Sequence, residues 1–446
     1  MPDAQVDQAS GAPPKRGLGP WMSLAMVVGT MIGSGIYLMP AVLAPYGPNV
    51  ALGWLLSIGG TMCIAFAMSR LAARIPGGPT AYITRAFGDL PAFVAMWSYL
   101  ISVWSGIAAV ALATAGALSY VFPAVATSSG ILVVAGGSIL ILTGINLTGV
   151  RKAGGLQVVA TLIKIVPLVG VLLLVAARVG GGEQLEPFAA VPIGSAGILA
   201  VAALTLFSLT GFEVGPITAP VTEDAERNVP RAQIWGVAFT GFIYFSATIA
   251  VLWLLPSAIA AQSKAPFADA IAPALGGAAG TLVALIAAIS AFGANNALIL
   301  CAAQVMRSLV SQGDLPPVFG RTGSAGVPYA ALIAGAVVAI TLLVLSAAPA
   351  FVSVYAFVAL VSAVAALLLY ALCSAAVLRL KISGGGLGTV ITLVAVAYSI
   401  AMFFGAGWEA TTWGIALALA GLPIRWLSRR YWPNPAPEAA PAAPAG

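Results

Sequence analysis

Long apolar stretches alternate with short polar segments along almost all of the 446-residue chain. A membrane-spanning helix needs about 20 consecutive apolar residues, and twelve stretches meet that requirement. The pattern therefore predicts an all-α integral membrane protein. The twelve transmembrane helices are expected at residues 18–46, 50–73, 89–121, 129–150, 154–178, 192–220, 231–256, 273–311, 327–348, 350–379, 386–406 and 409–429.

The basic residues between these stretches predict the orientation of the helices, because inner loops of membrane proteins carry an excess of Lys and Arg. With the N-terminus inside, the outer loops hold only Arg178 and Lys264. Both termini are then expected to be cytoplasmic. The inner segments hold Lys15, Arg16, Arg70, Arg74, Arg85, Arg151, Lys152, Arg227, Arg231, Arg307, Arg321, Arg379, Lys381, Arg425, Arg429 and Arg430.

Composition agrees with a membrane protein and excludes several functions. Hydrophobic residues make up 61% of the chain and charged residues 7%, whereas soluble proteins carry about 25% charge. The net charge of +6 follows the loops, which argues against a nucleic-acid partner. Histidine is absent, and Cys63, Cys301 and Cys373 all lie in apolar stretches. We therefore expect no His-based catalysis, no disulfide framework, no metal and no cofactor.

Two glycine-rich interruptions lie at corresponding places, five predicted helices apart. The first is Gly29–Gly35 in the first helix, and the second is Ser208–Pro216 in the sixth. Paired interruptions of this kind point to the substrate site of a transporter built from inverted repeats. Close helix packing is the alternative explanation for a single glycine, but two matched clusters favour broken helices.

Glu213 is the only acidic residue in the interior of the twelve stretches. A carboxylate near the middle of a bilayer costs roughly 2.5–3.5 kcal/mol even on the lenient insertion scale. Glu213 is therefore expected to face a cavity, where it binds a cationic group, exchanges a proton, or does both in turn. A structural hydrogen bond to a neighbouring helix is the alternative.

The first interruption is suited to a carboxylate. At Gly33, Ser34 and Gly35 the broken helix leaves backbone N–H groups for the carboxylate of an amino acid, helped by the positive end of a half-helix. Thr30 and Met31 precede this turn and belong to the predicted site. In the sixth helix, the carbonyl groups released by the break, with Ser208 or Thr210, are expected to receive an ammonium group.

Lys164 is the only base deep in a predicted helix. Its ammonium group could replace a bound sodium ion by bonding to carbonyl groups of the broken first helix, or it could extend along the helix to the membrane surface. Asn295 and Asn296 are polar neighbours in the eighth helix, where hydrogen bonding between helices explains them equally well. The aromatic residues Tyr99, Trp104, Phe207 and Tyr370 offer faces for a cation, although most such residues only pack.

Four segments resemble motifs of the amino acid–polyamine–organocation superfamily. They read VVGTMIGSGIYLMP, RIPGGPTAYITRAFGDLPAF, GFEVGPITAPVTEDAERNVPRA and GDLPPVF. The similarity covers nearly the whole chain without its tails. Within the superfamily the chain most resembles the bacterial basic amino acid/polyamine antiporters of the arginine/agmatine type.

The resemblance implies a 5+5 inverted repeat, usually a homodimer in the bacterial inner membrane, that exchanges substrates by alternating access without ATP. The repeats would occupy roughly residues 18–178 and 192–379, followed by two extra helices at 386–429. One transporter domain, 17–432, would then lie between the Pro/Ala-rich tails 1–16 and 433–446, which are predicted to be disordered cytoplasmic segments.

The resemblance also implies roles for single residues. Tyr99, Glu213 and Tyr370 match the gate beneath the substrate in these antiporters. Gly33, Ser34 and Gly35 match the turn that binds the substrate carboxylate, and Ser208 matches a polar contact of the sixth helix.

Four positions depart from the antiporters. Phe207 stands where they have the tryptophan that covers the guanidinium group, and Leu298 stands where they have a tryptophan of the middle gate. Thr30 and Ile107 replace two asparagines. These departures weaken the case for arginine itself.

Lys164 follows Gln157 by seven residues, which is the spacing of the proton-coupled and L-type amino acid transporters. The chain thus combines an antiporter-like glutamate with a lysine typical of these relatives.

The sequence therefore favours a membrane antiporter of cationic amino acids or their decarboxylated amines, with protons as a further partner. A proton-coupled or exchanging carrier of neutral amino acids is the alternative, in which Lys164 dominates and Glu213 stays protonated. A channel needs a continuous polar pore, and an enzyme needs convergent catalytic groups; the sequence provides neither.

Overall fold

A computed structural model describes residues 19–33, 35–148, 154–213, 222–323, 326–345 and 351–432, with only the backbone described at 154–162 and 225. Every regular element within these ranges is a helix, which confirms the predicted all-α class for the described part of the chain. Among these residues, eight helices are long and apolar enough to cross a membrane, and a bent pair of shorter helices forms a ninth candidate.

Most helices begin and end close to the predicted boundaries, because a continuous apolar run in lipid must satisfy its own backbone hydrogen bonds as a helix. These helices are α3 (Asn49–Ala72), α5 (Asp89–Val121), α6 (Ser128–Leu147), α7 (Gly154–Gly180), α10 (Ala225–Leu254), α13 (Gly277–Ser311), α14 (Tyr329–Leu345), α15 (Phe351–Arg379), α16 (Gly386–Gly405) and α17 (Gly407–Tyr431).

Both predicted interruptions coincide with helix ends. The first stretch divides into α1 (Pro20–Met31) and α2 (Gly35–Leu43), which with the short helix η1 (Ala44–Tyr46) form a pair bent by 47°. In the sixth stretch, predicted at 192–220, α8 (Ser195–Leu209) ends in the middle, at the second interruption.

The predicted start of the eighth helix lies four residues before the observed one. The stretch expected at 273–311 begins inside a separate short helix, α12 (Pro266–Leu275), and α13 follows after Gly276. Gly276 has φ +88°, a left-handed conformation that favours glycine and ends the helix there. The short helices α4 (Gly78–Phe87) and α11 (Ser257–Ala260) were not predicted, since both are too short for the span criterion.

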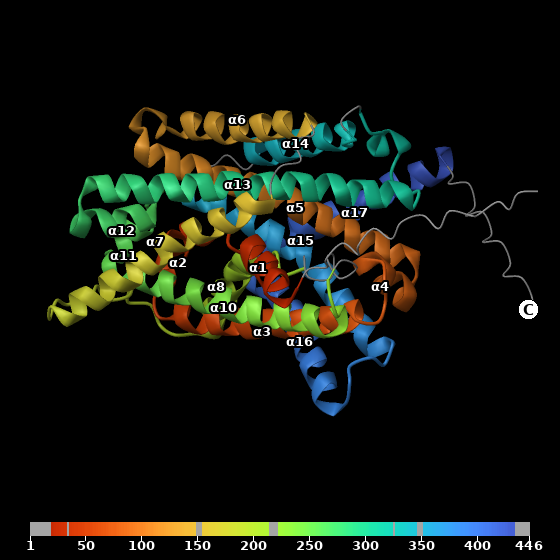
Figure 1. Cartoon of the computed structure of the whole chain (residues 1–446), viewed down its shortest axis with the longest axis horizontal. Coiled ribbons are helices and arrows are strands. Elements are labelled where there is room, and N and C mark those ends of the chain that lie inside the picture. The colour runs from red at the N-terminus through yellow and green to blue at the C-terminus, as the bar shows by residue number, and fades with distance from the viewer. Residues whose placement is uncertain are drawn as a thin grey trace, which may run out of the picture.

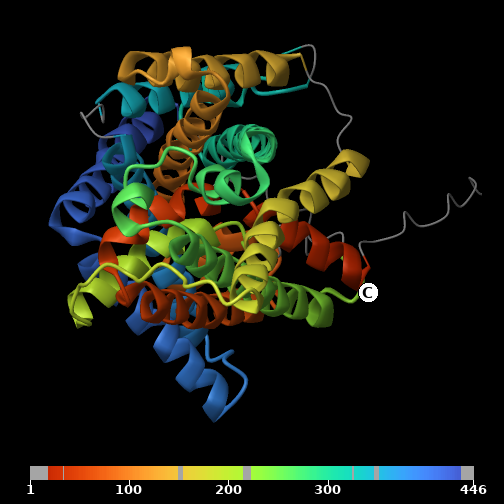
Figure 2. The same cartoon turned by 90° about the vertical axis from the view of Figure 1, so that its left-hand side faces the viewer.

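Helix α5 lies at the centre of the bundle and packs against α13 and α15. Helices α6 and α14 pack together along one side of the bundle, and α3, α10 and α16 lie on the opposite side (Figure 1). The broken pair α1 and α2 lies between these layers, and a second view shows the same order (Figure 2). The two breaks are therefore held inside the bundle.

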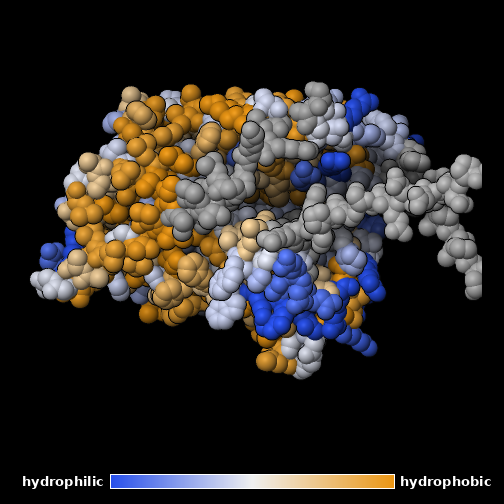
Figure 3. Space-filling model, viewed as in Figure 1, coloured by the Kyte–Doolittle hydropathy of each residue, from blue (hydrophilic) through white to orange (hydrophobic). Residues whose placement is uncertain are grey.

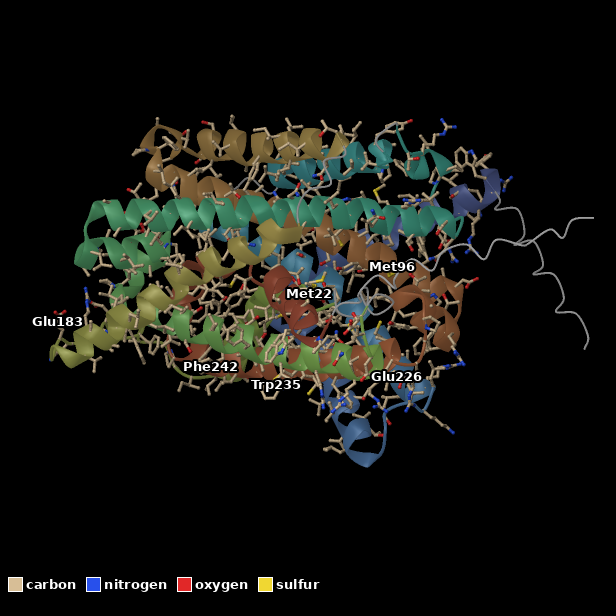
Figure 4. All side chains as sticks on the ribbon, in the orientation of Figure 1. Met22, Met96, Glu183, Glu226, Trp235 and Phe242 are labelled. Carbon is tan, nitrogen blue, oxygen red and sulfur yellow. The ribbon has the colours of Figure 1, made fainter. Side chains whose placement is uncertain are left out.

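Apolar side chains cover most of the visible face, and hydrophilic side chains gather toward the end of the bundle where α4 lies (Figure 3). Glu183 and Glu226 mark opposite ends, and Trp235 and Phe242 point outward from α10 between them (Figure 4). Both aromatic side chains are 67% exposed. Such an apolar belt between polar ends is expected of helices that contact lipid.

Candidate functional site

A cavity of about 150 Å³ lies where the two helix breaks meet. We call it the central cavity. Its wall includes eleven of the residues predicted for the site: Thr30, Met31, Gly33, Gly35, Tyr99, Lys164, Phe207, Ser208, Thr210, Glu213 and Leu298. Ser34 lies outside the described residues, and Tyr370 is not among the residues that line the cavity. Segments far apart in the sequence thus converge on one space.

Three carbonyl groups at the first break accept hydrogen bonds from side chains of other helices. The hydroxyl group of Tyr244 donates to Met31 O over 2.8 Å, and that of Tyr355 donates to Gly35 O over 3.1 Å. The ammonium group of Lys164, whose side chain is buried, donates to Ile32 O over 3.1 Å. The break is therefore stabilised by the protein without any ligand.

One of the three N–H groups predicted to bind a carboxylate is already bonded within the chain. Gly33 N–H donates to Met31 O over 2.7 Å and is therefore occupied. The first N–H groups of any helix have no partner inside that helix. The first turn of α2, which begins at Gly35, is therefore the better place for an anion.

The second break is built around Gly211, whose φ of +112° is readily adopted only by glycine. A Cβ atom at this position would lie 3.0 Å from Thr30 O. The hydroxyl group of Thr30 donates to Gly211 O over 3.1 Å. The two breaks therefore touch each other through backbone atoms, and a side chain at Gly211 would separate them.

Glu213 is buried at this second break, where both of its carboxylate oxygens accept hydrogen bonds. Oε1 accepts from the hydroxyl group of Tyr99 over 3.1 Å, and Oε2 accepts from Gly211 N–H over 2.9 Å. The ring of Tyr370 packs on Phe212 with 5.3 Å between ring centres. Its hydroxyl group lies beside the carboxylate without reaching hydrogen-bond geometry.

The hydroxyl groups of Ser208, in α8, and Thr210, in the turn after it, differ in their hydrogen bonding. Thr210 Oγ1 donates to Phe207 O over 2.7 Å and thereby caps the end of α8. Ser208 Oγ is buried and has no hydrogen-bond partner among the described residues. A Cβ atom on Gly35 would lie 2.9 Å from Ser208 Oγ, so glycine at this position allows α2 and α8 to approach closely.

Glu213 also separates the central cavity from a second one. This α4-side cavity of about 290 Å³ is lined by residues of α4 and of the segment before it. Tyr99, Glu213 and Cys301 belong to the walls of both cavities. The Tyr99–Glu213 hydrogen bond therefore spans the partition between them.

A third cavity of about 550 Å³ lies toward the opposite end of the bundle. This α11-side cavity is lined by residues of α2, η1, α8, α15 and the segment that follows α11. Along α15, Leu360 lines the α11-side cavity, Ser362 the central cavity and Leu369 the α4-side cavity. The three cavities therefore follow one another along the bundle.

An aromatic contact lies between the central and the α11-side cavities. Phe207 lines the central cavity, and its ring meets the ring of Tyr355 edge to face, with 6.2 Å between ring centres. Tyr355 is fully buried and holds Gly35 O of α2 by its hydroxyl group. This pair is a second partition, opposite the Tyr99–Glu213 hydrogen bond.

Other polar candidates lie away from the cavities. Asn296 accepts a hydrogen bond from Asn146 Nδ2 over 2.7 Å, which joins α13 to α6. Asn295 is fully buried, and neither polar atom of its side chain has a partner in the part of the chain that the structure describes. Trp104 packs edge to face on Trp97. None of these candidates lines the central cavity.

Several site residues were missed by sequence reasoning. Ser102 and Ser362 line the central cavity, and Ser362 Oγ donates to Ser102 O over 2.7 Å. Buried serines that only pack are common in membrane helices, so the sequence carried no signal for these two. The described residues contain no group of three or more Cys, Asp or Glu that could hold a metal ion.

The chain is similar in sequence to known amino acid and amine transporters. A sequence profile of the amino acid permease family matches residues 18–413. The chain is 28% identical over 344 residues to the cadaverine/lysine antiporter of Escherichia coli (strain K12), and the match covers 74% of each protein. It is 26% identical over 407 residues to the putrescine transporter PotE of the same strain, covering 88% of the chain and 91% of that protein.

Proposed function

Because the chain belongs to the amino acid permease family, we propose that it is a secondary active antiporter that exchanges cationic amino acids for their decarboxylated amines. It is a multi-pass membrane transporter and not an enzyme. The two relatives described above carry lysine, cadaverine or putrescine in their names. They do not favour the alternative of a carrier for neutral amino acids.

The observation that carries the proposal is the position of Glu213. It is the only acidic residue among the described residues that line the central cavity. The other charged residue of the wall is Lys164, whose ammonium group is already directed to Ile32 O. A buried carboxylate needs a compensating partner, and a substrate ammonium or guanidinium group supplies one.

The two helix breaks support a defined pose for an amino acid. Its carboxylate would lie at the first turn of α2, next to Gly35 and Ser208, where N–H groups and the helix dipole favour an anion. Its α-ammonium group would lie near the end of α8. The cationic side chain would then pair with Glu213, and a decarboxylated amine would keep this last contact.

The three cavities support alternating access. Opening the Tyr99–Glu213 partition, with Tyr370 behind it, would connect the central cavity to the α4 end. Opening the Phe207–Tyr355 partition would connect it to the other end. A cation and a proton would compete for Glu213, which offers a route for protons to influence exchange.

Lys164 is proposed to take the place of a bound sodium ion. Its ammonium group donates to Ile32 O at the first break, where a cation can hold the released carbonyl groups of α1. Transport by this chain would then not depend on sodium.

The proposed architecture has twelve spans, with α8, α14 and α17 added to the nine candidates found by length and apolar composition. The matched breaks in α1–α2 and after α8 favour inverted repeats at roughly 18–178 and 192–379, with extra helices at 386–429 in a transporter domain 17–432. We also propose cytoplasmic tails at 1–16 and 433–446. The protein would be a homodimer in the bacterial inner membrane.

Reconstitution into liposomes tests the proposed function. Purified protein is placed in vesicles loaded with lysine, arginine, cadaverine, putrescine or a neutral amino acid, and uptake of each radiolabelled solute is measured. We expect saturable uptake of cationic solutes only when a cationic solute is inside. Uptake that is confined to neutral amino acids, or that needs no internal solute, would contradict the proposal.

A further inference from the structure

The charged side chains of the three cavities differ from one end of the bundle to the other. Within the part of the chain that the structure describes, Glu213 is the only charged residue that lines the α4-side cavity. Glu213 and Lys164 line the central cavity. Of the described residues that line the α11-side cavity, only Lys264 is charged. The path thus has an acid toward one end and a base toward the other.

Lys264 contributes a positively charged residue to the wall of the α11-side cavity. Its half-buried ammonium group donates to Ala126 O over 2.6 Å, which fixes its position but does not neutralise it. Lys264 forms no ion pair within the described ranges. The nearest acid in the sequence is Asp269, which accepts a hydrogen bond from Ser263 and does not line the cavity.

The α11-side cavity adjoins the path by which a solute would reach the central cavity. Leu204 lies one turn before Ser208 on α8, and the two residues line the α11-side and central cavities respectively. A solute in the α11-side cavity would therefore feel the charge of Lys264 before it met Glu213.

We propose that Lys264 makes the α11 side of the transporter selective for substrates that carry a carboxylate, and unfavourable to diamines. Lysine and cadaverine differ only in the carboxylate, so lysine carries one net positive charge and cadaverine two. A fixed positive charge repels the dication more strongly. The described residues that line the α4-side cavity include no base, and Glu213 attracts a dication there.

The proposal rests on the proposed exchange function and orientation, in which the α11 end faces outward. Amino acids would then be accepted preferentially from outside and diamines from inside. The exchange would follow the gradients, but the sided affinities would favour uptake of the amino acid and release of the amine.

Competition experiments in liposomes test the role of Lys264. Vesicles containing protein and internal lysine take up external radiolabelled lysine, while unlabelled lysine or cadaverine competes from outside. For Lys264→Gln we expect the affinity for external cadaverine, relative to that for lysine, to rise about five-fold at low ionic strength. This is the effect of one charge at roughly 8 Å in a partly hydrated cavity. The gain should shrink as salt approaches about 0.15 M, where the screening length is about 8 Å.

Arg178→Gln is the matched control. Arg178 is the other basic residue predicted on the outer side, it pairs with Glu183 at 3.5 Å, and it does not line the cavity. This variant should leave the competition ratio unchanged. An equal shift in both variants would mean that only the general surface charge matters, and the proposal would be wrong.

A cysteine at position 264 keeps the proposal testable if the glutamine variant folds poorly. Lys264→Cys is treated from outside with a thiol reagent that adds either an ethylammonium or an ethylsulfonate group, with the unmodified chain as control for Cys63 and Cys301. The positive group should restore discrimination against cadaverine, and the negative group should reverse it. If the positively and negatively modified forms of Lys264→Cys show the same competition ratio of cadaverine to lysine, the inference is wrong. If the unmodified chain does not exchange substrates at all, the proposed function itself is wrong.

Discussion

Replacing Glu213 by glutamine tests the central element of the proposed site. The substitution keeps the shape of the side chain and removes its charge. A glutamine Oε1 can still accept from Gly211 N–H, and its amide group can donate to Tyr99 Oη, since a hydroxyl group can donate or accept. The break after α8 should therefore survive, and the variant should fold.

The expected loss of affinity follows from the contact that disappears. A hydrogen bond to a charged group contributes about 1.5–3 kcal/mol, and each 1.4 kcal/mol is about ten-fold in affinity. Lysine, arginine and cadaverine should therefore bind roughly 10- to 150-fold more weakly to Glu213→Gln. Neutral amino acids lack this contact, and their affinity should change by less than about three-fold.

The same variant predicts a change in pH dependence. A proton and a cationic substrate compete for the Glu213 carboxylate, so the affinity of the unmodified protein for lysine should fall as pH is lowered. The limiting slope is about ten-fold per pH unit, because one proton is exchanged. Glutamine cannot titrate, and the pH profile of Glu213→Gln should be flat.

Equilibrium binding to purified protein, measured by calorimetry between about pH 5 and pH 8, checks both expectations. The informative comparison is cationic against neutral ligands in the same preparation. If Glu213→Gln binds arginine, lysine and neutral amino acids as the unmodified protein does at every pH, then Glu213 is structural and the cationic-substrate proposal loses its main support.

Three further predictions concern the first break, Lys164 and the topology. Gly35→Val places a Cβ atom 2.9 Å from Ser208 Oγ and should abolish amino-acid binding in folded protein. The control Gly59→Val has nothing within 4 Å of its Cβ and should bind amino acids normally. Equal affinity in both variants would mean that the first break is not part of the site. Lys164→Ala leaves Ile32 O unpaired and should slow exchange more than it weakens binding, and sodium-stimulated transport by the unmodified protein would contradict the role given to Lys164. In a cysteine-free background, Arg85→Cys should react with an impermeant thiol reagent only from the cytoplasmic side, and Glu183→Cys only from outside. The reverse pattern would refute the orientation.

The sequence predicted the helices well where a single local signal decides the structure. Helix α5 occupies the predicted range 89–121 to the residue, because an uninterrupted apolar run in lipid has no alternative to a helix. The start of α13 was missed although the sequence contains Gly276, and glycine commonly ends a helix. Apolar content outweighed that local signal in the prediction.

The residues that complete the site were harder to predict, because their partners are distant in the chain. Tyr244 bonds to a carbonyl group 213 residues away, and Tyr355 to one 320 residues away. Nothing near either tyrosine indicates this role. The glycine interruptions did indicate where backbone groups are released, so the sequence located the break but not the groups that satisfy it.

The way these carbonyl groups are satisfied bears on the mechanism. Met31 O, Ile32 O and Gly35 O each accept a hydrogen bond from a side chain of a different helix, namely α10, α7 and α15. An unsatisfied carbonyl group in a membrane interior costs several kcal/mol, so these contacts stabilise the break without substrate. The site is then preformed, and substrate binding need not provide the energy to unwind a helix. Because the same three helices hold the break, any movement that opens one partition must either carry them along or exchange these bonds, which couples the binding site to the motion of the bundle.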